Sequence, residues 1–438
     1  MYEQDTIAAI ATPPGEGGVA IVRVSGPEAE AIATSVFFRP QEKSGRLQSH
    51  RLHHGGIRDP HTGRMVDEVL LTIMRKPHSY TGEDVVEIHG HGGTFISRQV
   101  LGVVLAQGAR QAEPGEFTKR AFLNGRLDLA QAEAVLDLIR ARTDKSAELA
   151  LQQVGGQLST WVQGLREELL DIIVQVEAAI DFPEEDIELL QRPDLLRNIN
   201  RLRVKIKNIL DTYDWGRLFR DGARVCICGR PNVGKSSLLN ALLGEARVIV
   251  TPVPGTTRDV IEESISLNGL PAVLWDTAGI HETEDQIERL GVQRSRQHVE
   301  KADAVVFVLD GSTALSADDR ALVDDIAGKK TLLAVNKCDL PRVLVVDEMT
   351  RLLDTYRLVY VSAKTGDGIG ELKESLRELI IGEEAEPAVA ITNLRHKSTL
   401  VRGAAALDHA LMALGDKHAS EFIAVDLYQA AEALEEIL

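Results

Sequence analysis

The chain has 438 residues, of which 44% are apolar, so it is long enough for about three domains with substantial cores. Acidic residues outnumber basic residues by 66 to 49, which gives a formal net charge of −17. This balance excludes a generally basic surface that coats RNA or DNA, so any nucleic-acid contact must use a local patch or a partner. The chain begins with no apolar signal sequence and contains no apolar run long enough to span a membrane, so we expect a cytoplasmic protein without membrane contact. The three cysteines are too few for a disulfide framework or a four-thiolate zinc site, and we expect reduced thiols at Cys226, Cys228 and Cys338.

Residues 1–118 alternate short apolar runs with glycine and proline turns, which predicts an α+β domain with an antiparallel or mixed sheet. Strands are predicted at 6–11, 19–24, 65–74 and 85–89, and helices at 27–37 and from the glycines at 90–93 to about 106. The glycine clusters favour turns, with close approach of a ligand as the alternative. His89 and His91 alternate along a strand and would share a face, but a metal site is the less favoured interpretation because no third ligand is evident.

Residues 119–216 have the apolar periodicity of helices and predict the first part of a helical domain. The periodic positions are Leu127, Ala130, Ala134, Leu138, Leu165, Leu169, Ile172 and Val176. A further helix is predicted from Pro193 to Tyr213, after an acidic segment at 181–186 that we interpret as a solvated loop, with a cation or partner site as the alternative. Residues 383–438 return to helical periodicity up to the last residues, so they would complete the bundle and make the intervening domain an insertion.

Residues 217–382 alternate strands with helices, the pattern of a doubly wound parallel sheet. Strands are predicted at 225–228, 260–267, 272–276, 304–310, 331–336 and 358–362. Asn268-Gly269 predicts a hairpin between the second and third of them.

The segment Gly229-Arg230-Pro231-Asn232-Val233-Gly234-Lys235-Ser236 matches the phosphate-loop pattern G-x-x-x-x-G-K-[ST] at every fixed position. It lies between the strand 225–228 and a helix that we expect to end at Gly244, which is the context that the motif needs. Lys235 would reach the β- and γ-phosphates, and the Ser236 hydroxyl would bind Mg²⁺. The predicted nucleotide contacts in this segment are Asn232, Val233, Gly234, Lys235 and Ser236, and Ser237 directly after it is also predicted to contact the nucleotide.

Three later stretches narrow the ligand to a guanine nucleotide. Asp276-Thr277-Ala278-Gly279 follows a strand, where Asp276 would hold Mg²⁺ through water and the Gly279 amide would contact the γ-phosphate. In Asn336-Lys337-Cys338-Asp339, the Asp339 carboxylate would accept hydrogen bonds from N1–H and the 2-amino group of guanine, donors that adenine lacks. Ser362-Ala363-Lys364 follows the last strand and would support the same base.

The segment 254–259 lies between the first two motifs and would act as a switch. Thr257 would place its hydroxyl on Mg²⁺ and its backbone on the γ-phosphate. Ile280 stands where common signalling GTPases carry a glutamine that orients the attacking water, and its side chain cannot do so. From chemistry alone four nearby acids remain candidates for that role: Glu282, Glu284, Asp285 and Glu288.

Taken together, these residues resemble the MnmE (TrmE) family of tRNA-modifying GTPases over nearly the whole chain. The stretches outside the nucleotide domain that carry the resemblance are Thr12-Pro13-Pro14-Gly15, Gly17-Gly18-Val19, Thr81-Gly82-Glu83-Asp84, Gly90-His91-Gly92-Gly93, Pro114-Gly115-Glu116-Phe117, Arg120-Ala121-Phe122-Leu123-Asn124, Leu127-Asp128-Leu129-Ala130-Gln131-Ala132-Glu133-Ala134 and Ala178-Ala179-Ile180-Asp181-Phe182-Pro183.

The resemblance implies a homodimer, formed by the N-terminal domain, that works with the FAD-containing protein MnmG (GidA) in a heterotetramer or larger assembly. Together such proteins place an aminomethyl or carboxymethylaminomethyl group on C5 of the wobble uridine (U34) of certain tRNAs. The one-carbon unit comes from a reduced folate (5-formyl- or methylene-tetrahydrofolate) in the N-terminal domain. The matching folate-contact positions are Arg23, Glu87 and Arg126.

The resemblance also implies that K⁺ replaces an arginine finger during GTP hydrolysis and that the nucleotide domains pair across it. The implied K⁺ ligands are Asn232, Thr251, Val253 and Thr256, and Thr251 and Thr256 join the nucleotide contacts. Among the four acids, Glu288 matches the water-orienting glutamate of the family and is the implied catalytic residue.

Family members usually continue into a short tail with a Cys-x-Gly-Lys ending, which the sequence lacks after Leu438. We therefore expect GTP hydrolysis without the folate contact that this tail supplies. Two alternatives remain: a ribosome-assembly GTPase that uses GTP only as a switch, and a folate-dependent transferase that keeps its GTPase domain for assembly. The glycine-rich N-terminal stretches favour the tRNA-modifying enzyme over the pure switch, because a switch needs no folate pocket.

Overall fold

The computed structural model describes residues 5–39, 46–181, 192–246, 263–276, 297–345, 356–382, 386–416 and 419–438. The chain divides into two compact units, Met1–Val135 and Leu136–Leu438. Within the described ranges, none of the helices combines the length and the apolar character that crossing a bilayer requires.

The described part of the first unit contains a seven-stranded sheet in the order β3-β4-β5-β6-β2-β1-β7. Its neighbouring strands are antiparallel except for β1 and β7, which are parallel, so the prediction of a mixed α+β domain is confirmed. The strands are β1 (Ile7–Ile10), β2 (Val19–Ser25), β3 (Phe37–Phe38), β4 (Leu52–Arg58), β5 (Met65–Met74), β6 (Val85–His91) and β7 (Arg110–Gln111). The helices are α1 (Ala29–Val36), α2 (Thr94–Ala106), α3 (Glu116–Leu123) and α4 (Leu129–Ile139), the last of which contains the boundary between the units.

Helices α1 and α2 contribute to the apolar core beside the sheet. Val22 and Val24 of β2 are buried in this core with Val100 and Val104 of α2. Because successive side chains of a strand point to opposite faces, Arg23 lies on the other face of the sheet. A ligand that contacts Arg23 would therefore bind on the face of the sheet opposite to this apolar core.

The glycines at 90–93 do not end the strand where we predicted, because β6 continues to His91. A Cβ atom on Gly92 would lie 1.8 Å from the carbonyl oxygen of Gly17, and the Gly92 amide donates a hydrogen bond to the Gly18 carbonyl, 3.3 Å away. The two glycine clusters therefore approach each other, which only a residue without a side chain permits at position 92.

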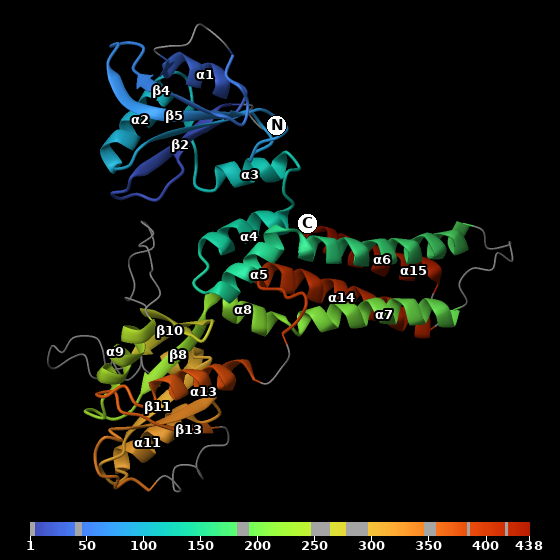
Figure 1. Cartoon of the computed structure of the whole chain (residues 1–438). Coiled ribbons are helices and arrows are strands. Elements are labelled where there is room, and N and C mark those ends of the chain that lie inside the picture. Colours follow the sequence, from blue (N-terminus) through green and yellow to red (C-terminus); the bar gives the residue numbers. More distant parts are fainter. Residues whose placement is uncertain are drawn as a thin grey trace. The chain divides into compact units, whose positions relative to one another are not determined.

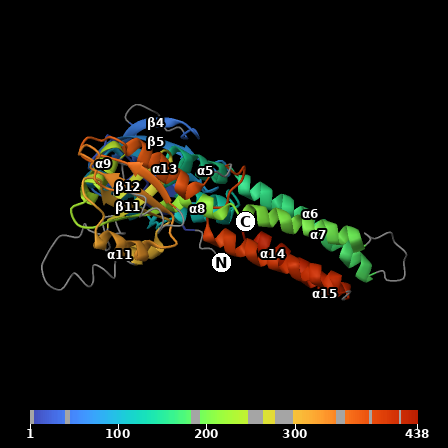
Figure 2. The ribbon, with the colours of Figure 1, turned by 90° about the horizontal axis from the view of Figure 1, so that it is seen from below.

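The helical part of the second unit contains α5 (Asp144–Val154), α6 (Gln157–Asp181), α7 (Arg192–Leu210), α8 (Tyr213–Asp221), α14 (Leu394–Gly415) and α15 (Ser420–Glu435). The four long helices α6, α7, α14 and α15 pack side by side (Figures 1 and 2). The C-terminal helices thus complete the bundle, as predicted. Two predicted ends are wrong: α7 stops at Leu210 and a separate α8 follows, and α15 stops at Glu435 instead of continuing to Leu438.

The inserted α/β part has a six-stranded sheet in the order β13-β12-β11-β8-β10-β9. All neighbouring strands are parallel except β9, which runs antiparallel to β10 at one edge. The strands are β8 (Ala223–Cys228), β9 (Glu263–Leu267), β10 (Leu270–Asp276), β11 (Ala304–Asp310), β12 (Thr331–Asn336) and β13 (Tyr356–Tyr360), and the helices include α9 (Lys235–Ala246), α11 (Ala317–Ile326) and α13 (Ile369–Ile381). The predicted hairpin is confirmed, because Asn268 (φ 46°) and Gly269 (φ 94°) both have the positive φ of a type I′ turn.

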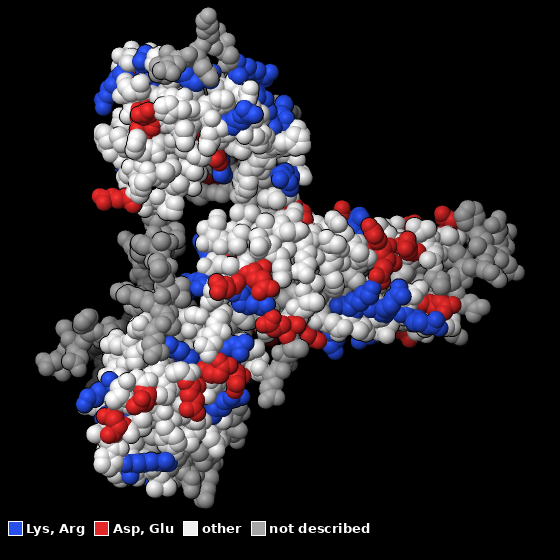
Figure 3. All heavy atoms as spheres, in the orientation of Figure 1, with Lys and Arg blue, Asp and Glu red and all other residues white. Residues whose placement is uncertain are grey.

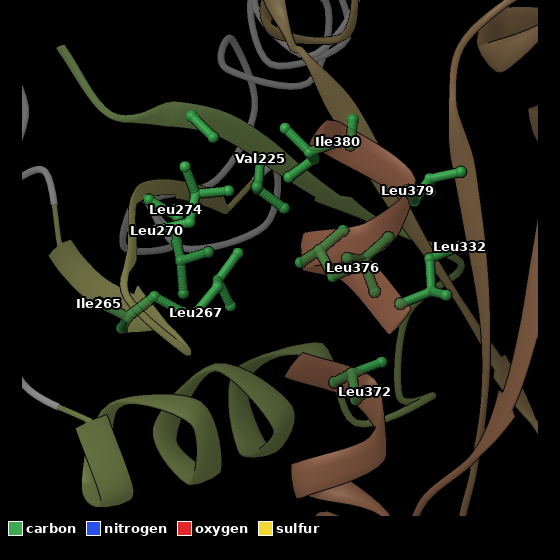
Figure 4. Packing of buried hydrophobic residues seen from close by; sticks show 14 of the residues in the cluster. Val225, Ile265, Leu267, Leu270, Leu274, Leu332, Leu372, Leu376, Leu379 and Ile380 are labelled. Carbon is green, nitrogen blue, oxygen red and sulfur yellow. The ribbon is translucent and has the colours of Figure 1, made fainter. Parts of the chain in front are cut away.

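Helices cover both faces of this sheet. On one face, Leu372, Leu376 and Ile380 of α13 pack with Val225 of β8 and Leu274 of β10 (Figure 4). A second cluster contains alternate residues of β8 and β11 together with α11. Burial on both faces is why β11 is apolar along nearly its whole length, and the prediction of a doubly wound α/β domain is confirmed.

Helix α9 is longer than we predicted. It continues through Gly244 to Ala246, whereas the sequence suggested that this glycine would end it. Apart from the backbone of its own helix and its chain neighbours, no atom of the described residues lies within 4 Å of the position that a Gly244 Cβ would occupy, so the glycine is tolerated without being required there.

Candidate functional site

The carboxyl ends of four parallel strands meet at one edge of the α/β sheet. The phosphate loop follows β8, Asp310 ends β11, Asn336 ends β12 and Ser362 follows β13. Strand β8 lies between β11 and β10, where the strand order reverses. In doubly wound sheets ligands bind outside the carboxyl ends of the strands at such a reversal, so this edge is the candidate ligand site.

Two glycines of the phosphate loop have conformations that only glycine adopts without strain. Gly229 has φ 147°, and a Cβ atom there would lie 2.4 Å from the carbonyl oxygen of Val308. Gly234 has φ 97°, and its Cβ would lie 2.3 Å from Nδ2 of Asn336. The spacing of the motif therefore follows from the close approach of this loop to β11 and β12.

Lys235 is buried at the start of α9, and its ammonium donates hydrogen bonds to the carbonyls of Gly229 at 2.8 Å and Arg230 at 2.9 Å. The lysine thus lies inside the loop that a phosphate would enter. Ser236 and Ser237 are exposed in the first turn of α9. Backbone amides at a helix start suit an anion and a hydroxyl oxygen suits a hard cation, so these residues fit a nucleotide phosphate with Mg²⁺.

Asn336 connects three loops of the site. Its Nδ2 donates to the Val233 carbonyl at 2.8 Å, and its Oδ1 accepts from the Ala363 amide at 3.0 Å. Asp339 is exposed, and its Oδ1 accepts a hydrogen bond from the Ser362 hydroxyl at 2.8 Å. One oxygen of this carboxylate is thereby oriented while the group stays accessible to a base. Lys364, in the loop that also contains Ser362, is exposed.

Sequence reasoning missed Asp310, which it treated only as the end of a strand. The Lys337 ammonium donates to Asp310 Oδ2 at 2.6 Å and to the Asn232 carbonyl at 3.1 Å. Burial would raise the pKa of Asp310, but hydrogen bonds from Lys337 and Ser312 hold that pKa below its usual value. An acidic residue at the carboxyl end of a fully buried parallel strand is the signal that could have identified it.

Several predicted nucleotide and ion contacts lie outside the described residues: Thr251, Val253, Thr256, Thr257, Thr277, Ala278, Gly279 and Glu288. Asp276 is the last described residue of β10, and its backbone pairs in register with Ile227 of β8. The strand therefore ends at the candidate edge, in agreement with the position that we predicted for the Asp276 motif.

The structure brings together two of the three predicted folate contacts. Arg23 and Glu87 are cross-strand partners of β2 and β6, with 2.8 Å between Arg23 Nε and Glu87 Oε1. The Arg23 guanidinium lies 5.1 Å from the ring centre of Tyr80 and 5.5 Å from that of Phe117. A guanidinium beside aromatic rings and next to a carboxylate suits a flat, polar heterocycle.

Arg126 is not joined to this pair. It is exposed, and its side chain makes no hydrogen bond or ion pair within the described ranges. The two predicted histidines contact acids: Nε2 of His89 lies 3.3 Å from Glu87, and Nδ1 of His91 lies 2.7 Å from Asp67. In the part of the chain that the structure describes, no group of three or more His, Cys, Asp or Glu side chains is arranged to hold a metal ion.

Other motif residues of the first unit form a buried polar network. The Arg120 side chain is completely buried and contacts Asp5 at 2.5 Å, Glu116 at 3.1 Å and Glu83 at 3.2 Å. The Ser25 hydroxyl continues the network, since it donates to Glu83 at 2.8 Å. A hydrogen bond from Arg110 is the main reason that the pKa of Glu116 is lowered to about 2. We interpret this network as a structural part of the fold. The Arg120 guanidinium is completely buried, so it is not accessible to a ligand.

Comparison with known proteins covers the whole chain. The sequence model of the MnmE helical domain matches residues 129–438, and that of the GTP-binding protein TrmE N-terminus matches residues 6–126. The chain is 47% identical over 440 residues to the tRNA modification GTPase MnmE of Geobacter sulfurreducens, a match that covers 100% of the chain and 95% of that protein. It is 44% identical over 436 residues to the protein of the same name from Natranaerobius thermophilus, covering 99% of the chain and 95% of the relative. A solved structure of the FeoB G domain from T. maritima is 28% identical over 36% of the chain and 98% of that domain, with a TM-score of 0.28, too low to support a structural argument.

Proposed function

Because the chain belongs to the family of tRNA modification GTPases named MnmE, we propose that it is a K⁺-stimulated GTP hydrolase that takes part in modification of the wobble uridine of tRNA. The observation that carries the GTPase part is the meeting of the phosphate loop with Asn336 and Ala363 at one edge of the sheet. Phosphate-binding and base-binding loops are thus held together by direct hydrogen bonds, as a nucleotide site requires.

Each residue at this edge has a proposed role. Lys235 binds the β- and γ-phosphates, and Ser236 binds Mg²⁺ together with Thr257. Asp339 accepts hydrogen bonds from guanine, and Ser362 orients its carboxylate. Glu288 orients the attacking water. Mg²⁺ and K⁺, when bound, would supply the positive charge that stabilises the charge developing on the phosphates.

The proposed K⁺ site includes Asn232, together with Thr251, Val253 and Thr256. Asn232 is exposed in the phosphate loop and has a left-handed backbone with φ 65°. Its side chain is therefore accessible to an ion, and an amide oxygen is a ligand that suits one. We further propose that two nucleotide domains pair across this site during hydrolysis.

The tRNA modification itself needs more than this site. We propose that the chain acts as a homodimer with the FAD-containing protein MnmG, in the cytoplasm, on U34 of tRNA, and that a reduced folate bound near Arg23 and Glu87 supplies the one-carbon unit. On the face shown in Figure 3, Lys and Arg of the helical bundle lie beside Asp and Glu. Arg201 and Lys205 of α7, for example, both contact Glu168 of α6. Because neighbouring acids neutralise these basic side chains, they would attract the phosphates of tRNA only weakly. This supports a role for the partner in holding tRNA.

The decisive test of the hydrolase is GTP turnover in KCl and in NaCl at equal ionic strength. We expect at least about tenfold faster turnover in KCl, since K⁺ would replace an arginine finger. The variant Asn232→Gly removes the amide without the left-handed strain that alanine would suffer, and it should reduce the preference for K⁺ while retaining GDP binding. Equal rates of the normal protein in the two salts would exclude the K⁺ assignment.

Folate binding is tested by calorimetry with 5-formyl-tetrahydrofolate. We expect Arg23→Ala to abolish binding, because the guanidinium is hydrogen bonded to the Glu87 carboxylate and lies close to both aromatic rings. Arg126→Ala tests the third predicted contact, and an unchanged affinity would remove Arg126 from the site. Absence of binding by the normal protein would exclude the folate role for this chain.

A further inference from the structure

A buried carboxylate at the end of β11 connects the loop that follows this strand to the candidate nucleotide site. Asp310 is 8% exposed, and both of its oxygens are hydrogen bonded. Oδ1 accepts from the amide of Ser312 at 2.9 Å and from its hydroxyl at 2.6 Å, while Oδ2 accepts from Lys337 at 2.6 Å. Loss of the cation from a buried ion pair is strongly destabilising, and here that cation is Lys337 of the loop Asn336-Lys337-Cys338-Asp339.

Lys337 extends the contact to the phosphate loop. Its ammonium also donates to the backbone carbonyl of Asn232 at 3.1 Å. Both residues of this hydrogen bond have left-handed backbones, with φ 66° at Lys337 and φ 65° at Asn232. Such conformations are costly for residues other than glycine and persist where surrounding contacts enforce them. The Lys337 side chain therefore joins the two strained residues to each other, and the same side chain is bonded to Asp310.

A second contact joins the same loop to the phosphate loop. Arg230 donates a hydrogen bond to the hydroxyl of Thr313, and its Nε lies 3.5 Å from Asp319 of α11. Asp319 is buried and forms a capping box with Ser316, so it is itself fixed. The segment after β11 thus supports the phosphate loop at two positions.

We propose that Asp310 is a positioning residue for guanine-nucleotide binding. Its carboxylate holds the Lys337 ammonium against the Asn232 carbonyl and so keeps the phosphate loop and the base loop in their binding shape before the nucleotide arrives. The inference rests on the proposed function, because it takes the ligand of this site to be a guanine nucleotide.

The first test is Asp310→Asn, which keeps the size of the side chain but removes its charge. We expect about tenfold weaker binding of both GTP and GDP, since both nucleotides meet the same two loops. The KM for GTP should rise by a similar factor, while kcat at saturating GTP stays within about twofold. Asp318→Asn, at an exposed position of α11, is the matched control and should change neither parameter. Unchanged nucleotide affinity in a folded Asp310→Asn protein would overturn the proposal.

A double-mutant cycle separates positioning from general stability. If Asp310 acts through Lys337, the protein carrying both Asp310→Asn and Lys337→Met should bind GDP no more than about twofold more weakly than Lys337→Met alone. Losses that multiply in the double variant would show that the two residues act independently and would contradict the inference.

Base discrimination provides the last readout. Inosine triphosphate lacks the 2-amino group of GTP, so Asp339→Asn should reduce the preference for GTP. Asp310→Asn should leave that preference unchanged, and a reduced preference would mean that Asp310 acts on the base. If the normal protein fails to bind any guanine nucleotide, the proposed function fails and this inference with it. Normal binding with independent effects of Asp310 and Lys337 would overturn this inference alone.

Discussion

Two regions of the molecule contain motif residues but differ in how exposed those residues are. One is the nucleotide edge, where the carboxyl ends of the parallel strands of the α/β sheet form the candidate ligand site. The other is the Arg120 network, the buried polar network around Arg120 in the first unit. At the nucleotide edge, Ser236 and Asp339 are exposed, and the Ser362 hydroxyl orients the Asp339 carboxylate. In the network, Arg120 is completely buried, as is Thr81, whose hydroxyl is hydrogen bonded to that of Ser25 at 2.7 Å. In this protein the motifs at the candidate ligand site include polar groups that reach solvent, although Lys235 and Asn336 of the same motifs are buried. A motif whose polar groups contact one another predicts a structural requirement of the fold.

Arg120→Ala should have the largest effect on this comparison. Removal of Arg120 breaks its buried contacts with Asp5, Glu116 and Glu83. Arg110 still pairs with Asp5 and Glu116, whereas Glu83 loses its ion pair, and we expect a loss of about 3–5 kcal/mol in the stability of the first unit. Hydrogen exchange in peptides of residues 5–39 and 110–124 measures that loss.

Two controls accompany the Arg120 variant. Arg126→Ala, at an exposed position, should change stability by less than about 0.5 kcal/mol. The three tryptophans, Trp161, Trp215 and Trp275, all belong to the second unit, so their fluorescence reports whether the other unit stays folded. Normal exchange protection in Arg120→Ala would show that the network is dispensable.

Gly234→Ala tests the nucleotide side of the comparison. Alanine there would have φ 97° and a Cβ atom 2.3 Å from Asn336, so we expect a cost of about 2 kcal/mol, or about thirtyfold weaker GDP binding. Gly244→Ala, in an open position of α9, is the matched control and should stabilise the helix by about 0.5–1 kcal/mol. Equal GDP affinities of the two variants would contradict this account of the loop.

An effect similar in size to that of Gly234→Ala concerns pH. The pKa of Glu116 is lowered from 4.5 to about 2, chiefly by Arg110, so its ionised form stabilises the folded first unit. This stability is fully present above pH 4.5 and is lost as the pH falls toward 2. Since Arg110 is half-exposed and solvent weakens the ion pair, we expect the ionised Glu116 to contribute on the order of 2 kcal/mol to the stability of the first unit. Acid unfolding of Glu116→Gln, followed by hydrogen exchange in the same peptides, should therefore depend less steeply on pH than that of the normal protein. An identical slope would contradict the assignment.

The sequence alone was sufficient for elements whose residues determine their own local structure. Strand 331–336 was predicted at its observed bounds because a continuous apolar run ends in a polar residue at the sheet edge. The hairpin at Asn268 and Gly269 was predictable because few residues accept two successive positive φ angles. The phosphate loop was recognisable for a related reason, since its glycines and lysine have fixed spacing along the chain.

The tertiary structure decided the features that depend on residues far apart in the sequence. Gly92 needs to be glycine because of Gly17, Arg120 is neutralised by Asp5, and Asp310 matters because of Lys337. Gly244 marks no helix end, because α9 continues through it. Local patterns specify backbone conformation, whereas burial, close approach and ion pairing depend on which strands and helices become neighbours when the chain folds.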